Sequence, residues 1–175
     1  MTPLEAVLRR AIRDIPDFPK PGIVFKDITP VLLDASLFRR TTEAMAAPYA
    51  ASEITHVVGI ESRGFILGAP IAQHLDAAFV PVRKPGKLPS SVERVEYALE
   101  YGLDALEVHR DAMQWGHRVL IVDDVLATGG TAAAACRVIE LLGAEVVGLT
   151  FLMTLSFLPG EQSLAGRRTA SLIRY

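Results

Sequence analysis

A chain of 175 residues, half of them hydrophobic and 22% charged, has the size and composition of one globular domain with a sizeable core. Its formal net charge of −2 excludes attraction to nucleic acid or to an anionic membrane through bulk charge, so a bound anion needs a local site. The single cysteine, Cys136, excludes an internal disulfide, and the four histidines show no metal-ligand spacing.

No apolar run reaches the ~18–20 residues that span a bilayer. The first residues, MTPLEAVLRRAIRDIPDFP, predict an amphipathic helix whose apolar face carries Leu4, Val7, Leu8, Ala11 and Ile12. A transit peptide is the alternative, but Glu5 and Asp14 fit it poorly. We therefore expect a helix packed on the body of a cytoplasmic protein.

The next segment, IPDFPKPGIVFKDITP, holds four prolines and cannot form regular structure for long. An ordered stretch that carries aromatic residues is typical of a lid or cap over a site.

The middle of the chain alternates short apolar runs with helical patterns. We expect strands over residues 55–60, 77–83, 118–124 and 145–155, and helices over 63–75 and 129–144, the last ended by Gly143. Strands that are apolar on both faces and separated by helices predict a parallel sheet covered on both sides, which is an α/β fold. Cys136 falls in the second helix and is interpreted as core packing.

Residues 84–92, KPGKLPSSV, are too polar for a core and predict a mobile loop. The two apolar runs that follow it predict the strands of a hairpin, over residues 95–101 and 105–111.

The stretch VLIVDDVLATGGT, residues 119–131, combines features that suit different ligand groups. Asp123 and Asp124 follow a wholly apolar strand, at the sheet edge where parallel sheets bind ligands. The turn TGGT then opens a helix, where free N–H groups, close backbone approach and threonine hydroxyls favour a phosphate. A sugar phosphate satisfies both, because its hydroxyls suit the acids and its phosphate suits the turn.

A plain strand end with solvated acids and a glycine-rich turn is the alternative for this stretch. The motifs G-x-x-x-x-G-K-[ST] and G-x-G-x-x-G are absent, so neither a P-loop nor a dinucleotide fold is supported.

The same stretch resembles the phosphoribosyl-diphosphate signature of the type I phosphoribosyltransferases. Four flanking segments are similar, in family order, to the adenine phosphoribosyltransferases: FPKPGIVFKDITPVL, IESRGFILG, VRKPGKLP and LEYGLDALEVHRDA. The resemblance implies one domain over residues 1–175, with a twisted, mostly parallel sheet flanked by helices. It also implies an N-terminal helix and base-binding hood over 1–35, and a flexible loop and hairpin over 84–109.

The activity implied by the resemblance is purine salvage. The phosphoribosyl group of 5-phosphoribosyl 1-diphosphate would move to N9 of adenine, giving AMP and pyrophosphate. Mg²⁺ would be held through substrate oxygens rather than by a cluster of protein ligands. The family pattern also implies a homodimer, and neither nucleic acid nor membrane as a partner.

The resemblance also assigns roles to individual residues. The 5′-phosphate would be held by Ala127, Thr128, Gly129, Gly130 and Thr131, and the ribose hydroxyls by Asp123 and Asp124. Pyrophosphate would be held by Arg63, Arg83, Lys84 and Lys87. The adenine would be held by Val24, Phe25, Lys26 and Leu155, with Phe25 stacking on the ring. Glu100 would be the general acid/base near N7, with Tyr101 beside it.

Each assignment has an ordinary structural alternative. The basic cluster could be a solvated face, Phe25 could be core packing, and Glu100 could be surface charge. Ser62 could simply cap the helix that follows it.

Thr154 and Pro159 depart from the family pattern, which puts base selectivity in doubt more than the reaction. Two rival functions stay open: a transferase for a 6-oxopurine, with Lys26 as the donor to the base, and a regulator that binds the same ligands without turnover.

Overall fold

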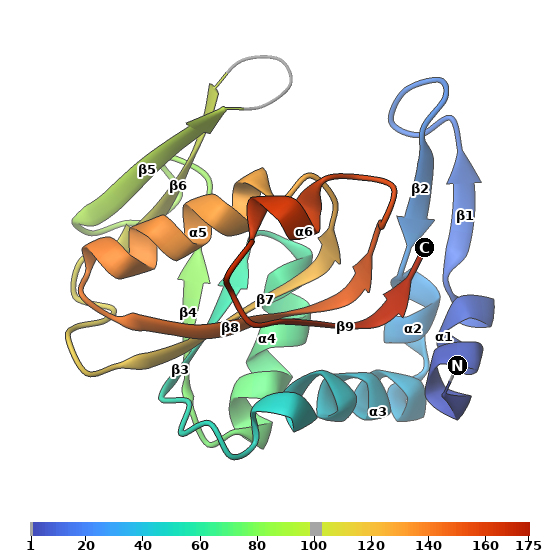
Figure 1. The fold of residues 1–175 in the computed structure, drawn as a ribbon, viewed down its shortest axis with the longest axis horizontal. Coiled ribbons are helices and arrows are strands. Elements are labelled where there is room, and N and C mark those ends of the chain that lie inside the picture. The colour runs from blue at the N-terminus through green and yellow to red at the C-terminus, as the bar shows by residue number, and fades with distance from the viewer. Residues whose placement is uncertain (1, 99–102) are drawn as a thin grey trace.

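The computed structural model describes residues 2–98 and 103–175. At its centre lies a sheet of parallel strands in the order β4-β3-β7-β8-β9 (Figure 1). The strands are β3 (His56–Ile60), β4 (Ala78–Val82), β7 (Arg118–Leu126), β8 (Glu145–Thr154) and β9 (Thr169–Arg174). The predicted α/β class and mostly parallel sheet are confirmed, whereas β9 lies in a segment for which the sequence predicted no element.

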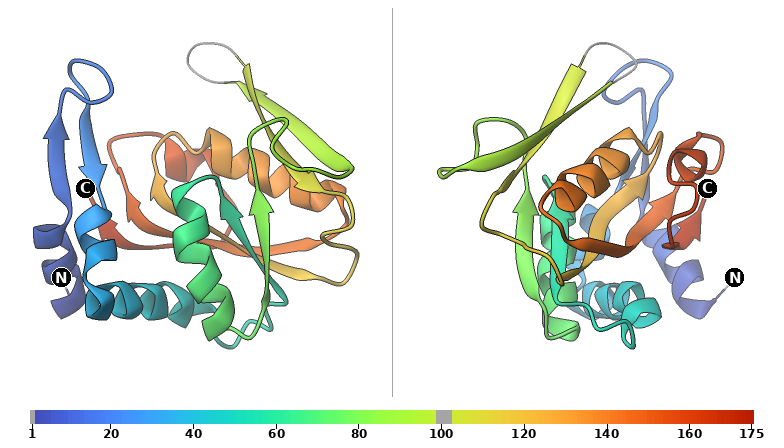
Figure 2. Two further views of the ribbon diagram at one scale, coloured as in Figure 1. Left: turned by 180° about the vertical axis from the view of Figure 1, so that it is seen from behind. Right: turned by 60° about the vertical axis from the view of Figure 1, so that its left-hand side comes forward.

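Helices cover both faces of this sheet (Figure 2). One face is covered by α3 (Ala35–Ala46) and α4 (Arg63–His74), the other by α5 (Gly130–Leu141). The central strand β7 shows why both faces must be covered. Val119 and Ile121 pack in the cluster with α5, while Leu120 and Val122 pack in the cluster with α4, and all four are fully buried.

The N-terminal segment forms α1 (Pro3–Ala11), as predicted. Thr2 caps this helix by accepting a hydrogen bond from the backbone N–H of Glu5 at 3.1 Å. Leu8 and Ile12 are buried in the hydrophobic cluster that also holds residues of α3 and α4, which confirms a helix packed on the body.

The proline-rich segment that follows holds regular structure only in two four-residue strands, β1 (Arg13–Pro16) and β2 (Val24–Asp27). They pair antiparallel, stand beside the central sheet (Figure 1) and lead into the short helix α2 (Thr29–Leu33).

A second hairpin, β5 (Val92–Ala98) and β6 (Leu103–His109), lies against α5. Backbone hydrogen bonds of 2.9 and 2.8 Å between Arg83 and Glu107 tie it to the end of β4. Both strands begin earlier than predicted, and β6 also ends earlier, because the chain already turns at His109, whose carbonyl accepts from the N–H of Ala112. Residues 99–101 of the first predicted strand lie outside the described residues.

Strand β7 corrects a second predicted boundary, because it continues past Asp124 to Leu126. The neighbouring strand β8 extends alongside it and pairs Val125 with Met153 and Leu126 with Thr154. The two acids therefore lie inside the last part of the strand rather than after it.

Cys136 is fully buried in α5, and burial raises the pKa of its thiol to about 11. This confirms its packing role.

Among the described residues, no helix is both long and apolar enough to cross a membrane.

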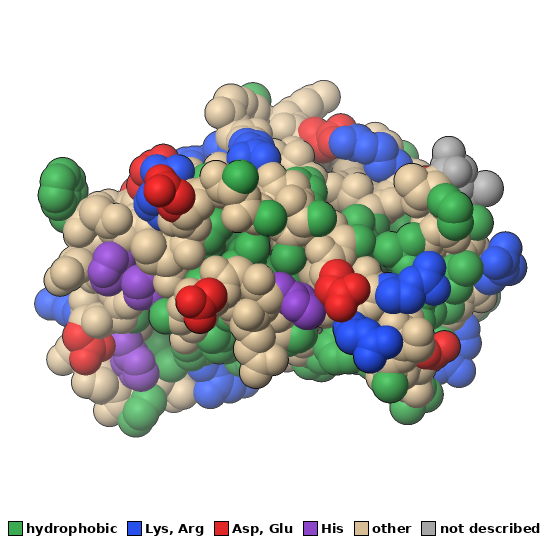
Figure 3. Space-filling model, turned by 90° about the horizontal axis from the view of Figure 1, so that it is seen from below, with side chains coloured by type: hydrophobic (Ala, Val, Ile, Leu, Met, Phe, Trp, Pro, Cys, Tyr) green, Lys and Arg blue, Asp and Glu red, His purple; other side chains and the backbone are tan. Residues whose placement is uncertain are grey.

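Figure 3 shows the face below the amino ends of β3 and β4, where histidine, acidic and basic side chains are scattered among apolar atoms. Two of the histidines, His56 and His117, stack with their ring centroids 4.1 Å apart.

Candidate active site

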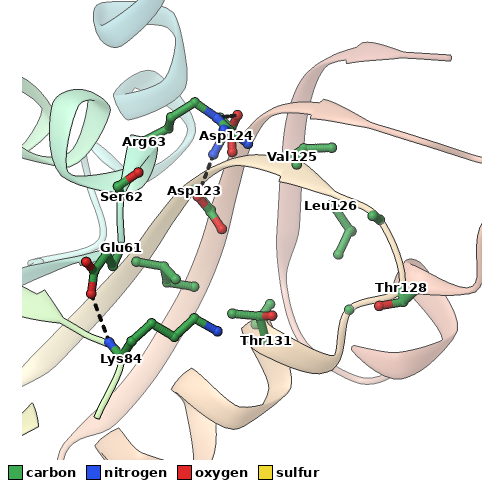
Figure 4. Close-up of a pocket in the computed structure, with 14 residues that line it drawn as sticks. Glu61, Ser62, Arg63, Lys84, Asp123, Asp124, Val125, Leu126, Thr128 and Thr131 are labelled. Atoms are coloured by element: carbon green, nitrogen blue, oxygen red, sulfur yellow. Dashed lines mark hydrogen bonds and ion pairs between the residues drawn. The ribbon is translucent and has the colours of Figure 1, made fainter. Parts of the chain in front are cut away.

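A cavity of about 300 Å³ opens at the carboxyl ends of β3 and β7, in front of the first turn of α5 (Figure 4). It is lined by residues 60–63 after β3, by Lys84, and by residues 123–129 and 131–132. Because β3 and β7 are neighbours in the sheet, the segment ESRG, the two acids and the glycine turn meet in one place.

The glycine turn is shaped by backbone geometry and by the chain behind it. Gly129 adopts a φ of +83°, and a Cβ there would lie 2.7 Å from Cβ of Ser163 and 2.8 Å from the carbonyl oxygen of Gly160. Only glycine fits this position. Behind the turn, α6 (Gly160–Ser163) braces it, since the Ser163 hydroxyl donates to the Thr128 carbonyl at 2.7 Å.

Four of the five residues predicted to hold a phosphate line the cavity: Ala127, Thr128, Gly129 and Thr131. The fifth, Gly130, is the first residue of α5. The supporting role of Ser163 was not predicted, and no local pattern in the sequence indicates it.

The two acids differ in their surroundings. Asp124 is buried and forms an ion pair with the side chain of Arg63, 61 residues earlier in the chain. Asp123 lines the cavity, and its carboxylate accepts a hydrogen bond from the backbone N–H of Asp124 at 2.9 Å. Burial, together with the nearby charge of Asp124, raises the pKa of Asp123 well above its usual value. Asp124 is therefore paired with Arg63, while Asp123 lies in a site that disfavours its charge.

Arg63 connects the acids to the N-terminal hairpin. Its guanidinium carbon lies 5.2 Å from the ring centroid of Phe25, which in turn meets the ring of Phe18 edge-on at 5.2 Å. Sequence analysis assigned Arg63 to pyrophosphate, beside the purine. The structure places it between Asp124 and Phe25, at the wall of the cavity.

The neighbours of Phe25 in β2 point elsewhere. Val24 is 51% exposed. The ammonium of Lys26 lies 2.6 Å from Asp14 and 3.9 Å from the ring centroid of Tyr175. Its side chain is therefore already engaged by the hairpin and by the C-terminal residue.

The basic residues of the loop are organised by Glu61, a residue that sequence analysis did not select. Its carboxylate accepts from Arg83 at 3.2 Å, from Lys87 at 3.1 Å and from the backbone N–H of Lys84 at 2.9 Å (Figure 4 shows the last of these). Burial of Glu61 disfavours its charge, but these three donors outweigh burial and lower its pKa to about 2. The structure thus brings Arg83, Lys84 and Lys87 together around one carboxylate.

The side chain of Lys84 extends into the cavity (Figure 4) and is held at its end by two residues of the hairpin. Its ammonium forms an ion pair with Asp104 and donates to the Tyr97 hydroxyl at 2.9 Å. Burial opposes its charge, but the bonds to Asp104 and Tyr97 raise its pKa. Neither hairpin residue was selected from the sequence.

Other predicted residues lie outside the cavity or outside the described chain. Glu100 and Tyr101 fall among residues 99–102, which the structure does not describe. Leu155 is half-buried next to the end of β8, where its N–H donates to the carbonyl of Leu126 at 2.9 Å.

The two departures from the family pattern have local roles. Thr154 is buried and its hydroxyl lies 2.6 Å from that of Ser171 in β9. Pro159 directly precedes α6, the brace behind the turn. Ser62 precedes α4, but its side chain makes no capping hydrogen bond to the described residues.

Comparison with known proteins decides the family. The family model described as phosphoribosyl transferase domain matches residues 34–160. An adenine phosphoribosyltransferase of Myxococcus xanthus is 58% identical over 176 aligned residues, which cover 99% of this chain and 95% of the relative. The chain belongs to the adenine phosphoribosyltransferases.

Solved structures of this family have the same fold. An adenine phosphoribosyltransferase from Rhodothermus marinus superposes with a TM-score of 0.94 at 54% identity, covering 98% of both chains. That of Saccharomyces cerevisiae, solved with an imino-altritol bisphosphate and adenine, gives a TM-score of 0.91 at 38% identity, covering 97% of this chain and 98% of that one. The resemblance stated from the sequence motifs is confirmed, and the chain is a pentose-transferring enzyme of the type I phosphoribosyltransferase fold.

Proposed function

We propose that the cavity carries out the reaction of its family, moving the phosphoribosyl group of 5-phosphoribosyl 1-diphosphate onto N9 of adenine to give AMP and pyrophosphate. The observation that carries this proposal is one cavity that joins the glycine turn of α5 to two adjacent carboxylates of β7. A phosphate and vicinal hydroxyls on one molecule match that pair of features.

The turn supplies the anchor for the 5′-phosphate. Free N–H groups at the amino end of α5 and the hydroxyls of Thr128 and Thr131 are donors that the fold sets in place beforehand. Gly129 lets the phosphate approach the backbone closely. Such a site stabilises a bound anion with little reorganisation on binding.

Asp123 and Asp124 are assigned to binding of the ribose hydroxyls. Asp123 opens into the cavity and can accept from a ribose hydroxyl, while the ion pair with Arg63 fixes the orientation of Asp124. A divalent cation fits this arrangement, because one carboxylate faces the cavity and hard cations prefer oxygen ligands. Mg²⁺ bound through donor oxygens would neutralise charge on the pyrophosphate.

We propose that Mg²⁺ is held mainly through substrate oxygens. Among residues 2–98 and 103–175, no group of three or more His, Cys, Asp and Glu side chains is placed to hold a metal ion.

The leaving pyrophosphate is met by Arg83, Lys84 and Lys87. In the structure Arg83 and Lys87 form ion pairs with Glu61, and Lys84 forms one with Asp104. Pyrophosphate, which carries more negative charge than either carboxylate, would replace these partners on binding. Arg63 borders the same space from the other side.

Adenine would bind between the β1–β2 hairpin and the cavity. The backbone of Val24 to Lys26 offers a carbonyl and an N–H to the amino and ring-nitrogen edge of the base, and Phe25 stacks on its face. A 6-oxopurine would need the ammonium of Lys26 as donor, but Asp14 and the Tyr175 ring engage that group. This observation favours adenine.

Glu100 stays the proposed general acid/base at N7, and Leu155 the proposed wall of the base pocket. We also propose that the protein forms a homodimer. Light scattering tests this, since the expected molar mass is twice that of one chain.

The decisive experiment is AMP formation from 5-phosphoribosyl 1-diphosphate and Mg²⁺ with adenine, hypoxanthine or guanine, run in parallel. We expect turnover with adenine alone. A Lys26→Met variant is the matched control and should keep adenine turnover, because its backbone contacts persist. Turnover with an oxopurine would overturn the base pocket. Tight donor binding without turnover of any base would identify a regulator instead.

A further inference from the structure

The hydroxyl of Tyr97 joins three side chains that belong to separate parts of the fold. It accepts from the ammonium of Lys84 at 2.9 Å and from the hydroxyl of Thr131 at 3.3 Å, and it donates to Asp104 at 3.1 Å. Lys84 and Thr131 line the cavity, whereas Tyr97 stands behind them. One hydroxyl thus connects the loop after β4, the hairpin and the first turn of α5.

The hairpin register sets this hydroxyl in place. Tyr97 and Asp104 are directly opposite in the β5–β6 pair, so their side chains project from the same face. The Tyr97 side chain is only 5% exposed and packs in the same hydrophobic cluster as Leu106 and Ala132. A ring fixed by packing on both hairpin and helix leaves its hydroxyl little freedom.

The two cavity residues joined by Tyr97 belong to opposite ends of the donor under the proposed function. Thr131 belongs to the turn assigned to the 5′-phosphate, and Lys84 to the group assigned to pyrophosphate. We propose that Tyr97 is a positioning residue that sets the spacing between these two anion sites and thereby the affinity for 5-phosphoribosyl 1-diphosphate. This inference rests on the proposed function.

Asp104 alone cannot supply this spacing. The side chain of Asp104 bonds to Lys84, Tyr97 and the backbone N–H of Ala105, none of which belongs to α5. The hydroxyl of Tyr97, by contrast, bonds to Lys84 and to Thr131 of α5. When pyrophosphate draws Lys84 from Asp104, the bond to Tyr97 can persist.

The test compares two variants that each remove one hydroxyl from a buried tyrosine. Tyr97→Phe keeps the packed ring. Tyr49→Phe is the matched control, because Tyr49 is also buried. Its hydroxyl donates to the Leu149 carbonyl at 2.8 Å and contacts neither Lys84 nor Thr131. KM for the donor, KM for adenine, kcat and Tm are measured for each.

We expect Tyr97→Phe to raise the donor KM about fivefold, with kcat and the adenine KM within about twofold of the wild type. The effect is modest although three hydrogen bonds are lost, because Lys84 keeps its ion pair with Asp104. Tyr49→Phe should lower Tm and leave all three kinetic constants unchanged. In a Lys84→Met background, Tyr97→Phe should change the donor KM by less than about twofold, because the residue it positions is gone.

The outcomes separate the two proposals. A wild-type protein that forms no AMP contradicts the proposed function. A wild-type protein that is active, with Tyr97→Phe unchanged in donor KM, contradicts only the role of Tyr97. The same holds if both tyrosine variants lose activity equally, if the effect survives in the Lys84→Met background, or if Tyr97→Phe is unfolded at the assay temperature.

Discussion

Single carboxylates decide how charge is arranged around this cavity, and Glu61 is the strongest example. Its side chain is 13% exposed and faces three donors from the loop that follows β4. Its pKa of about 2 lies below the value of 4.5 for an ordinary glutamate, so its charge stabilises the folded state. That stabilisation is complete above about pH 4.5 and is lost as the pH falls toward 2.

We therefore expect Glu61→Gln to lower Tm most at neutral pH, with the difference from wild type shrinking between pH 4.5 and pH 2. Thermal unfolding across this range measures it. The control is Glu96→Gln, because Glu96 is largely exposed and pairs with Arg94 on the surface of the hairpin. A difference for Glu61→Gln that stays constant down to pH 2 would contradict the interpretation.

Asp124 gives a second prediction. Asp124→Asn keeps the shape of the side chain but removes the charge that holds Arg63. We expect the donor KM to rise about 10- to 100-fold, since hydrogen bonds to charged groups contribute about 1.5–3 kcal/mol. Asp14→Asn makes the same change in the exposed pair with Lys26 and should leave the donor KM within about twofold.

Glu100 should affect the chemical step instead. Glu100→Gln removes the proposed acid/base, and we expect kcat to fall about 10²- to 10⁴-fold with little change in donor KM. Steady-state kinetics at saturating adenine provide the measurement. Equal and small effects of Asp124→Asn and Glu100→Gln would refute both role assignments.

At the scale of elements, the first turn of α5 is the most demanding part of the site. Gly129 needs both its left-handed backbone and the space that Ser163 and Gly160 leave beside it. Gly166 has nearly the same φ, +82°, but no described atom lies within 4 Å of a Cβ built there. A comparison of alanine substitutions at Gly129 and Gly166 therefore separates the cost of backbone strain from the cost of steric overlap.

Gly166→Ala should lower stability by about 1–2 kcal/mol, the cost of a left-handed alanine, without changing the donor KM. Gly129→Ala should cost clearly more and should raise the donor KM, because α6 and the turn must move apart. Denaturant unfolding and donor kinetics measure the two effects. Similar losses from both variants would show that steric contact at the turn is unimportant.

For the whole molecule, the fold and the metal are expected to be independent. A chelator should abolish AMP formation and the rise in Tm caused by the donor, while leaving Tm of the free protein unchanged. The reason is that the donor oxygens, rather than a cluster of protein ligands, are proposed to hold Mg²⁺. A chelator that lowers Tm of the free protein would reveal a resident metal and contradict the proposal.

Local patterns of sequence determined much of this protein. The apolar runs of β3, β7 and β8 predict a covered parallel sheet, because a strand buried on both faces has no polar alternation. The turn TGGT predicts an anion site because the amino end of any helix presents free N–H groups, whatever packs behind it. Motif resemblance added the family and the base.

Only the tertiary structure decided which charges meet. Arg63 and Asp124, which form an ion pair, are 61 residues apart. Glu61 binds residues of the loop after β4, and the Tyr97 hydroxyl bonds to both Lys84 and Thr131. The extension of β7 to Leu126 likewise depends on its partner β8. Ion pairs, strand ends and bracing contacts depend on neighbours distant in sequence, and the sheet order that brings them together is a property of the whole chain.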